Sequence, residues 1–122
     1  MAIKSFLDLQ VYQEALLLAK EVHSFISTLP KDEKYLLADQ TKRASRAIPS
    51  LIAEAWSHRE LTKEFRSYLR DTIGETNEMM SHLEQARLFG YLDESKARSL
   101  IERYDKLAAK LSKLKNNWRT FP

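Results

Sequence analysis

Four stretches of the chain carry apolar residues at helical spacing, and short breaks with turn-forming residues separate them. They cover residues 5–28, 31–57, 62–89 and 93–118. Each is long enough for a helix of about 37 Å at the usual helical rise. Because the connections are short, consecutive helices should run antiparallel. The pattern predicts an all-α single domain over residues 1–122, an antiparallel up-down-up-down four-helix bundle.

Start and stop signals agree with these boundaries. Ser5 and Asp8 have the spacing of a capping box, and Pro30 should end the first helix. Thr62 is the expected N-cap of the third helix, and Gly90 should end that helix. An aspartate three residues beyond Gly90, Asp93, should cap the fourth helix.

In the third and fourth stretches the apolar residues alternate steps of three and four, so each helix has one apolar face. The face of the third consists of Phe65, Leu69, Thr72, Thr76, Met79, Leu83 and Ala86. The face of the fourth consists of Ala97, Leu100, Tyr104, Leu107, Leu111, Leu114 and Trp118. We expect both faces to form the core.

The second stretch keeps helical spacing through a proline. Its apolar face consists of Leu37, Thr41, Ala44, Ile48, Ile52 and Ala55. Because this spacing continues beyond Pro49, we predict that the second helix is kinked at Pro49 and does not end there.

The first stretch differs because it has two apolar stripes. One consists of Leu7, Val11, Leu18, Val22 and Phe25, and the other of Leu9, Tyr12, Leu16, Ala19 and Ile26. Together they span an arc of about 200° on a helical wheel, which is more than packing against one core requires. Either the helix lies deep between its neighbours, or the second stripe contacts another copy of the chain. A continuous apolar stripe usually has a partner, which favours self-association.

Two further features bear on self-association. Gly74 lies opposite the apolar face of the third helix, where glycine costs about 1 kcal/mol relative to alanine, and close approach of a neighbour would explain it. Gln40, Arg43 and Glu54 lie at the edge of the second apolar face, where they could form a polar ladder with partners on another helix or subunit. The candidate oligomer interface or polar ladder therefore comprises Gln40, Arg43, Glu54, Gly74, Val11 and Leu18.

Composition excludes several classes of protein. The chain has 122 residues, no cysteine, two glycines and three prolines. The absence of cysteine excludes disulfides, thiolate metal sites and cysteine nucleophiles, and the low glycine content disfavours an all-β fold. The N-terminal residues become amphipathic at once and lack the apolar run of a signal peptide or membrane span. We expect a cytoplasmic protein that does not bind membranes.

Charge is distributed unevenly along this basic protein. The formal net charge is +3, but residues 1–40, 41–70, 71–95 and 96–122 carry −2, +4, −5 and +6. In the last segment four cations follow at intervals of three, four and three, so they share one helix face, which we expect to be exposed and opposite the apolar face. With two arginines of the third helix, the candidate nucleic-acid-binding residues are Arg103, Lys106, Lys110, Lys113, Arg66 and Arg70.

This basic face has two interpretations. An ordinary solvated surface would explain lysines on an exposed helix, whereas repetition of the face in an oligomer would allow several simultaneous phosphate contacts. No base-reading motif or aromatic platform is visible, so binding should involve the phosphate backbone with little sequence selectivity.

No motif indicates an enzyme. The chain has no Glu-x-x-His pair of the di-iron kind, no nucleophile elbow and no phosphate-binding loop. Glu54 with His58, and Glu78 with His82, could each chelate a metal ion, but exposed intrahelical pairs explain this spacing more simply. We expect a non-enzymatic protein without a cofactor or metal.

The segment from Gln40 to Glu54 carries a family resemblance. It contains Gln-x-x-Arg-Ala-x-x-x-Ile-Pro-x-x-Ile-Ala-Glu, together with FLDLQVYQEA, TKEFRSYLR and a later A-x-x-F-G-Y-L. In these motifs the chain resembles the bacterial four-helix-bundle family of ribosomal RNA intervening-sequence proteins. Ala47, Leu51 and Ala55 stand where serine, asparagine and glycine are usual in that family, which weakens the polar ladder.

The resemblance implies a homopentameric ring of bundles with basic surfaces, associated with nucleic acid and without enzymatic activity. Some relatives are similar to accessory proteins of diversity-generating retroelements, which implies a reverse transcriptase as a further partner. Three hypotheses follow for this chain: an oligomeric bundle that binds RNA or DNA, a protein-interaction scaffold such as an accessory ring for a reverse transcriptase or other polymerase, and, more distantly, a binder of a metal or small ligand.

Overall fold

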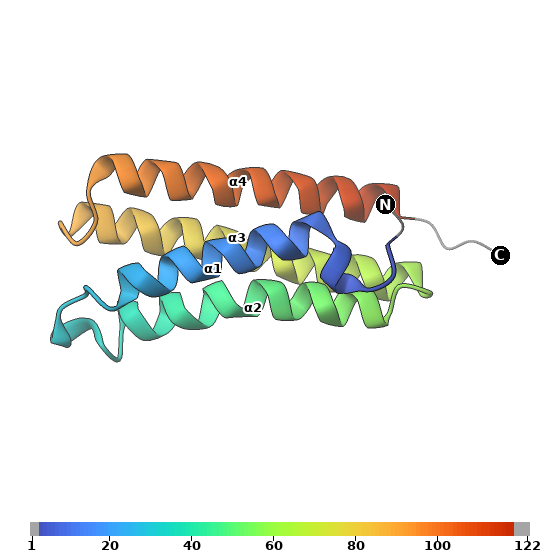
Figure 1. Ribbon diagram of the computed structural model, residues 1–122, viewed down its shortest axis with the longest axis horizontal. Helices are drawn as coiled ribbons and strands as arrows, with labels where there is room; N and C mark the ends of the chain where they lie inside the picture. The colour runs from blue at the N-terminus through green and yellow to red at the C-terminus, as the bar shows by residue number, and fades with distance from the viewer. Residues whose placement is uncertain (1–2, 119–122) are drawn as a thin grey trace.

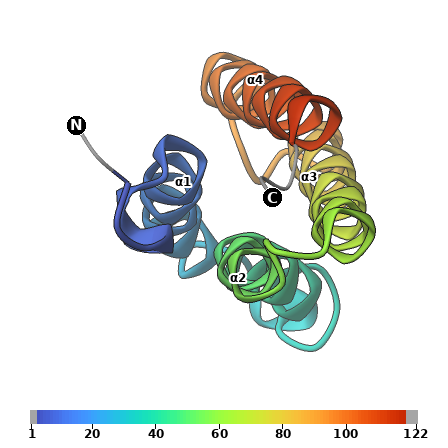
Figure 2. The same ribbon diagram turned by 90° about the vertical axis from the view of Figure 1, so that its right-hand side faces the viewer.

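The computed structural model describes residues 3–118 and shows four α-helices around one apolar core. They are α1 (Gln10–Ile26), α2 (Leu37–Ser57), α3 (Thr62–Leu88) and α4 (Glu94–Asn117), with 3₁₀ helices η1 (Phe6–Asp8) and η2 (Lys31–Glu33) before α1 and α2. The connections between consecutive α-helices lie at alternate ends of the molecule (Figure 1). Viewed from one end, the helices surround the core in chain order (Figure 2). The predicted four-helix, all-helical fold is confirmed.

The apolar faces predicted for three of the helices form the core. In α3 and α2 every residue of the predicted face is buried. In α4 the face is buried from Ala97 to Leu111, whereas Leu114 and Trp118 pack against the core and are partly buried. Burial of these faces supplies the main driving force for folding, because apolar surface leaves water there.

The N-terminal helix is shorter than predicted. Ser5 and Asp8 form the predicted capping box, in which the Asp8 carboxylate accepts a hydrogen bond from the Ser5 N–H at 3.3 Å. This box closes only one 3₁₀ turn, because Leu9 is extended (φ −69°, ψ 129°) and α1 begins at Gln10. Leu7, the first residue of one of the two predicted apolar stripes, is consequently 55% exposed.

The second helix also begins later than predicted. Residues 31–33 form η2, and Leu36 (φ −120°, ψ −104°) interrupts the chain before α2 begins at Leu37. Glu33 stabilises this connection, since its carboxylate accepts hydrogen bonds from the Leu37 N–H at 3.4 Å and from the Tyr91 hydroxyl at 3.0 Å. The segment is therefore tied to the connection between α3 and α4.

Helix α2 continues through Pro49, as predicted. Residues on both sides of Pro49 are helical, and the Pro49 ring is buried. A proline lacks the N–H that would bond to the carbonyl four residues earlier, here that of Ser45. The size of any kink at Pro49 stays a prediction.

Gly90 ends α3 as predicted. Its φ is +80°, in the left-handed region that favours glycine. The Tyr91 N–H donates to the Ala86 carbonyl at 2.8 Å and the Gly90 N–H to the Arg87 carbonyl at 3.1 Å, which is the hydrogen-bond pattern of a Schellman motif.

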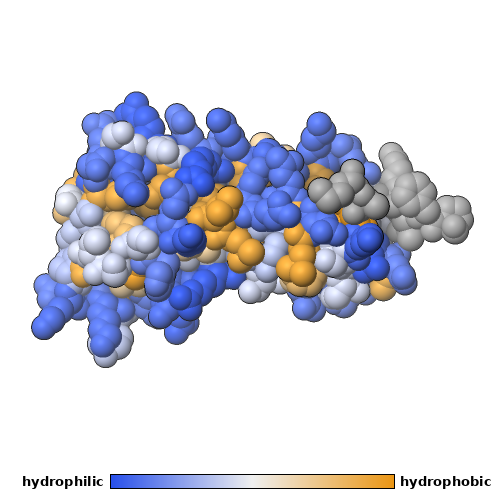
Figure 3. Space-filling model, in the orientation of Figure 1, coloured by the Kyte–Doolittle hydropathy of each residue, from blue (hydrophilic) through white to orange (hydrophobic). Residues whose placement is uncertain are grey.

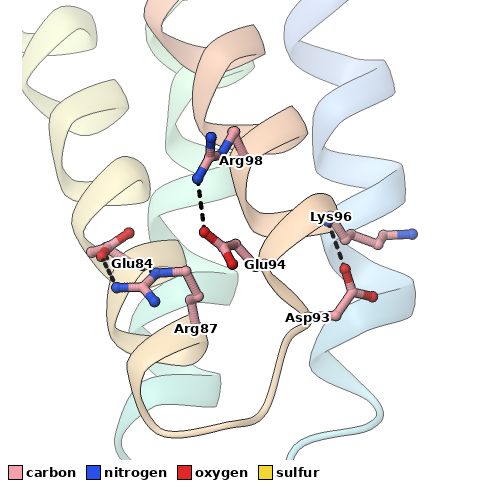
Figure 4. Close-up of polar contacts among 6 residues, drawn as sticks. All are labelled: Glu84, Arg87, Asp93, Glu94, Lys96 and Arg98. Atoms are coloured by element: carbon pink, nitrogen blue, oxygen red, sulfur yellow. Dashed lines mark hydrogen bonds and ion pairs between the residues drawn. The ribbon is translucent and has the colours of Figure 1, made fainter.

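Asp93 caps α4 as predicted. Its carboxylate accepts a hydrogen bond from the Lys96 N–H at 2.8 Å (Figure 4). Two ion pairs flank this turn, each within one helix (Figure 4). They join Glu84 to Arg87 at 2.5 Å and Glu94 to Arg98 at 2.7 Å. The cap and the Schellman motif together fix where α3 ends and α4 begins.

Candidate nucleic-acid interface

A pocket of about 590 Å³ lies where α3 begins and α4 ends. It is lined by Thr62, Lys63, Arg66, Ser67, Arg70, Lys115 and Asn116. All four charged side chains of this lining are cationic, and no carboxylate is among them. This pocket, hereafter the basic pocket, brings four cationic side chains together in one concave site.

Two helices position the cations of the basic pocket. Lys63, Arg66 and Arg70 are spaced by three and four residues along α3, so they lie on one face of that helix. Lys115 comes from the last turn of α4. The first N–H groups of α3 also carry partial positive charge at this end, with the Glu64 carboxylate in the same turn.

Arg66 holds the two walls of the pocket together. Its Nε donates to the Lys115 carbonyl at 3.0 Å, and its Nη2 donates to the Trp118 carbonyl at 3.1 Å. The last carbonyls of a helix have no intrahelical donor, so Arg66 satisfies two acceptors at the end of α4. Arg66, which was predicted to bind nucleic acid, thus has a structural role. An arginine side chain has five N–H donors, so three donors of Arg66 remain after these two hydrogen bonds.

Aromatic packing supports the end of α4 against α2 and α3. The Trp118 ring stacks on Phe65 with the ring centroids 4.2 Å apart, and Trp118 Nε1 donates to the Arg59 carbonyl at 2.9 Å. The Arg59 guanidinium in turn lies 4.5 Å from the Trp56 ring centroid. These contacts fix the pocket walls before any ligand arrives, which lowers the entropic cost of binding.

The basic face predicted for α4 lies beside α1, not fully in solvent. Arg103 forms an ion pair with Glu21, and Lys110 forms one with Glu14 at 2.5 Å. Both carboxylates belong to α1, so two cations of the predicted face are paired within the chain, although the side chains of Arg103 and Lys110 stay 40% and 43% exposed. The reason is that α1 packs beside α4, which the periodicity of α4 alone cannot show.

The remaining cations of this face are less neutralised. Lys106 lines the groove between α1 and α4 with Leu17 and Leu18, and Lys113 lines a second groove nearer the end of α4. Neither lysine has an ion-pair partner within residues 3–118. Both remain available for phosphate contacts.

The polar ladder does not form as predicted. The Arg43 guanidinium pairs with Asp39 at 3.2 Å and is 80% exposed, and Glu54 Oε1 lies 3.3 Å from His58 Nε2. Both contacts join residues four apart in α2, so the predicted partners on another helix of the same chain are not found, because helical spacing supplies nearer ones. Partners on another subunit stay a prediction. The Gln40 side chain is exposed and has no hydrogen-bond partner within residues 3–118.

His58 links α2 to α3. Its Nδ1 lies 2.9 Å from Glu64 Oε2, and its ring stacks on Tyr68 with the centroids 4.8 Å apart. Within residues 3–118 no group of three or more histidine, cysteine, aspartate or glutamate residues could hold a metal ion. Glu54 and His58 themselves make a contact of 3.3 Å between residues four apart in α2.

Three residues assigned to the interface have different surroundings. Val11 and Leu18 are only 7% and 2% exposed and belong to the core of the chain's own bundle, so their assignment to an interface with another copy is wrong. The wide apolar arc had obscured which stripe faces inward. Gly74 is exposed, and a Cβ built on it meets no atom within 4 Å, so the fold of the chain does not require a glycine there.

Sequence reasoning missed Lys63 and Lys115 of the basic pocket. The position of Lys63, three residues before Arg66 and seven before Arg70, is a signal that periodicity could have found. Lys115 gives no such signal, because its neighbours in the pocket are about 50 residues away in the chain and only the packing of α4 on α3 brings them together.

Comparison with protein families identifies the chain. Nothing among the helices of residues 3–118 has the length and apolar character needed to cross a membrane. The family model of the 23S rRNA-intervening sequence protein matches residues 7–113, which include α1, α2, α3 and most of α4. A search of curated proteins found no match. Because the family model covers most of its length, the chain belongs to the 23S rRNA-intervening sequence protein family.

Proposed function

We propose that this protein is a non-enzymatic, self-associating helical bundle that binds the phosphate backbone of nucleic acid with little sequence selectivity. The observation that carries the proposal is the basic pocket, whose four charged side chains are cationic and whose lining contains no carboxylate. A concave site lined only by positive charges focuses the electrostatic field and attracts anions that fit into it.

The basic pocket is a better phosphate site than the α4 face. On that face α1 carboxylates neutralise Arg103 and Lys110. Displacing these carboxylates would cost part of the energy that a phosphate contact gains. We therefore assign the main phosphate contacts to Lys63, Arg70 and Lys115, and secondary contacts to Lys106 and Lys113.

Self-association would strengthen binding. A single pocket neutralises few phosphates, whereas an assembly presents several pockets to one strand, and each neutralised phosphate releases a counterion. The family name refers to an intervening sequence in ribosomal RNA, which makes RNA the first ligand to test, with DNA beside it. No base-reading element accompanies the pocket, so unrelated sequences should bind alike.

A second candidate function is a protein-interaction scaffold. The observation in its favour is an exposed apolar cluster at the end of the bundle opposite the basic pocket, where the α1–α2 and α3–α4 connections meet (Figure 1). Tyr35, Leu36, Leu88 and Phe89 are 80%, 59%, 70% and 57% exposed there. Exposed apolar clusters mark protein interaction sites in many proteins.

A salt titration separates the two functions. Fluorescence anisotropy of labelled RNA and DNA duplexes of unrelated sequence would be recorded over a range of potassium chloride concentrations. If an assembly neutralises about five phosphates, the slope of log affinity against log salt on duplex DNA should be near −4.5. Absence of binding at low salt, or binding that is insensitive to salt, would leave the scaffold as the better account.

A further inference from the structure

A groove of about 560 Å³ runs between α1 and α2, well away from the basic pocket. Apolar residues of both helices form its floor, among them Tyr12, Leu16 and Pro49. Leu16 is 45% exposed in the isolated chain. Apolar residues gather along the middle of the face that carries α1, bordered by hydrophilic ones (Figure 3). This surface, hereafter the α1–α2 groove, leaves an apolar floor open to water.

The polar side chains around the α1–α2 groove are basic. Lys20 and His23 of α1 and Arg46 of α2 line it, and no carboxylate does. None of the three has an ion-pair partner within residues 3–118. The groove therefore combines an apolar floor with uncompensated positive charge, and an apolar surface bearing carboxylates would complement it.

Helix α3 carries carboxylates that could supply this opposite charge. Asp71, Glu75 and Glu78 lie three and four residues apart, hereafter the acidic strip, and none has an ion-pair partner in the described part of the chain. Partial burial raises the pKa of the Glu75 carboxyl, and the neighbouring Glu78 and Asp71 carboxylates raise it further. The acidic strip therefore has no ion-paired cation among residues 3–118.

Gly74 lies beside the acidic strip, next to Glu75. It is exposed, and a Cβ at this position would stand in open space. A mid-helix glycine costs about 1 kcal/mol relative to alanine, and nothing in the chain's own packing offsets that cost. Without a side chain, however, the α3 backbone can approach a neighbouring surface closely.

We propose that the acidic strip and Gly74 of one copy dock into the α1–α2 groove of a second copy. Three carboxylates would then face Lys20, His23 and Arg46, while the apolar floor becomes covered. The two surfaces belong to different helices, so the contact is heterologous and repeats from copy to copy into a ring or an open chain. This inference rests on the self-association in the proposed function and specifies its contact surfaces.

Charge reversal tests the pairing. One variant carries Lys20→Glu and Arg46→Glu, a second carries Glu75→Lys and Glu78→Lys, and a third combines all four substitutions. Each double variant places like charges opposite each other and should be monomeric by light scattering, whereas the combined variant restores opposite charges and should recover the wild-type mass. Lys34→Glu with Lys96→Glu makes the same change in net charge as the first variant, away from the groove, and should leave the mass unchanged. Circular dichroism verifies that each variant is folded.

Several results would overturn the inference. A wild-type chain that is monomeric at high micromolar concentration would do so, as would a folded double variant that keeps the wild-type mass. A combined variant that stays monomeric would refute the pairing of these two surfaces even if each double variant dissociates. Titration of the same samples with labelled RNA tests the proposed function separately. The basic pocket is intact in all of these variants, so even the monomeric ones should still bind RNA at low salt.

Discussion

At the scale of single residues, the structure shows how one cation can have two roles. The sequence shows Arg66 only as one of several cations on a helix face. In the folded chain its guanidinium donates hydrogen bonds to two carbonyls at the end of α4 and so caps that helix. The sequence could not predict this role, because the carbonyls that it bonds lie about 50 residues away and are brought near by tertiary packing alone. By contrast, the caps at Ser5 and Asp93 were predictable, because each depends on residues within three positions.

Replacing Arg66 by glutamine should destabilise the protein. The change removes two charge-assisted hydrogen bonds to half-buried carbonyls and should lower the free energy of unfolding by about 1 to 2 kcal/mol. Urea denaturation would measure the loss. Arg70→Gln is the matched control, because Arg70 is exposed and, within residues 3–118, its side chain bonds only to Ser67 Oγ, at 3.4 Å. Equal effects of the two substitutions would contradict a capping role for Arg66.

Replacing Glu75 by glutamine should stabilise the dilute protein at neutral pH. Glu75 has a raised pKa, so the folded chain binds its proton more tightly than the unfolded chain does, and stability falls as the pH rises through that range. Glutamine removes the like-charge repulsion and should raise the free energy of unfolding by about 0.5 kcal/mol at pH 7.5. The gain should vanish near pH 4, where the wild-type carboxyl is protonated.

Urea denaturation of Glu75→Gln at both pH values, on dilute samples, provides this measurement. Glu60→Gln, at an exposed carboxyl outside the acidic strip, is the control and should change stability little at either pH. A gain of equal size at both pH values would show that the effect of Glu75 is not electrostatic.

At the scale of elements, periodicity predicted which faces pack but not where every helix begins. The buried faces of α2 and α3 were predictable, because apolar residues at steps of three and four lie on one side of a helix and only that side can face the core. The starts of α1 and α2 were not, because the preceding residues form 3₁₀ turns that a sequence pattern does not distinguish from the first turn of an α-helix. Before α1 the apolar residue Leu7 even continues the helical spacing. Extended or irregular backbone at Leu9 and Leu36 separates these turns from the helices.

Pro49 gives the sharpest test at this scale. Pro49→Ala restores the N–H opposite the Ser45 carbonyl and removes the helix penalty of proline, which is about 3 kcal/mol. It also removes about two buried methylene groups, at about 0.8 kcal/mol each. The balance predicts a gain in the free energy of unfolding of about 1.4 kcal/mol by urea denaturation. A loss of stability would show that the fold depends on the proline ring or on a bend in α2.

At the scale of the whole molecule, the candidate site depends on contacts that no single stretch contains. The basic pocket joins the start of α3 to the end of α4, and the ion pairs that neutralise part of the α4 face come from α1. Arg66 and Arg70 could therefore be identified from the sequence, but the residues that surround them in the folded chain could not. The segregation of charge along the chain was visible in the sequence, whereas which charges are compensated became visible only in the fold.

Gly74→Leu separates folding from assembly. The chain has open space at this position, so leucine should leave the isolated bundle folded and, as a better helix former, slightly more stable. In the proposed contact between copies the same side chain would block the approach of the α3 backbone. Light scattering should then show smaller species than the wild type, and an unchanged mass would argue that Gly74 lies outside any interface. Gly74→Ala, which adds one methyl group, should have a smaller effect on assembly.

Phosphate binding by the basic pocket is tested most directly by reversing its charges while sparing Arg66. The pocket variant carries Lys63→Glu, Arg70→Glu and Lys115→Glu. Its control carries Lys34→Glu, Lys42→Glu and Lys96→Glu, the same change in net charge at positions that line no pocket described here. A third variant reverses Lys106, Lys110 and Lys113 on the α4 face. All three are compared with the wild type by anisotropy of a labelled DNA duplex across a salt series.

We predict that the pocket variant loses at least about tenfold in affinity at low salt. Its salt slope should become less steep by about 2.7, which corresponds to about three lost phosphate contacts. The control should lose far less, and the α4 variant should fall between them, because Lys110 is already paired with Glu14. A pocket variant that binds as tightly as the wild type, or no better and no worse than the control, would contradict the assignment of nucleic-acid binding to the basic pocket.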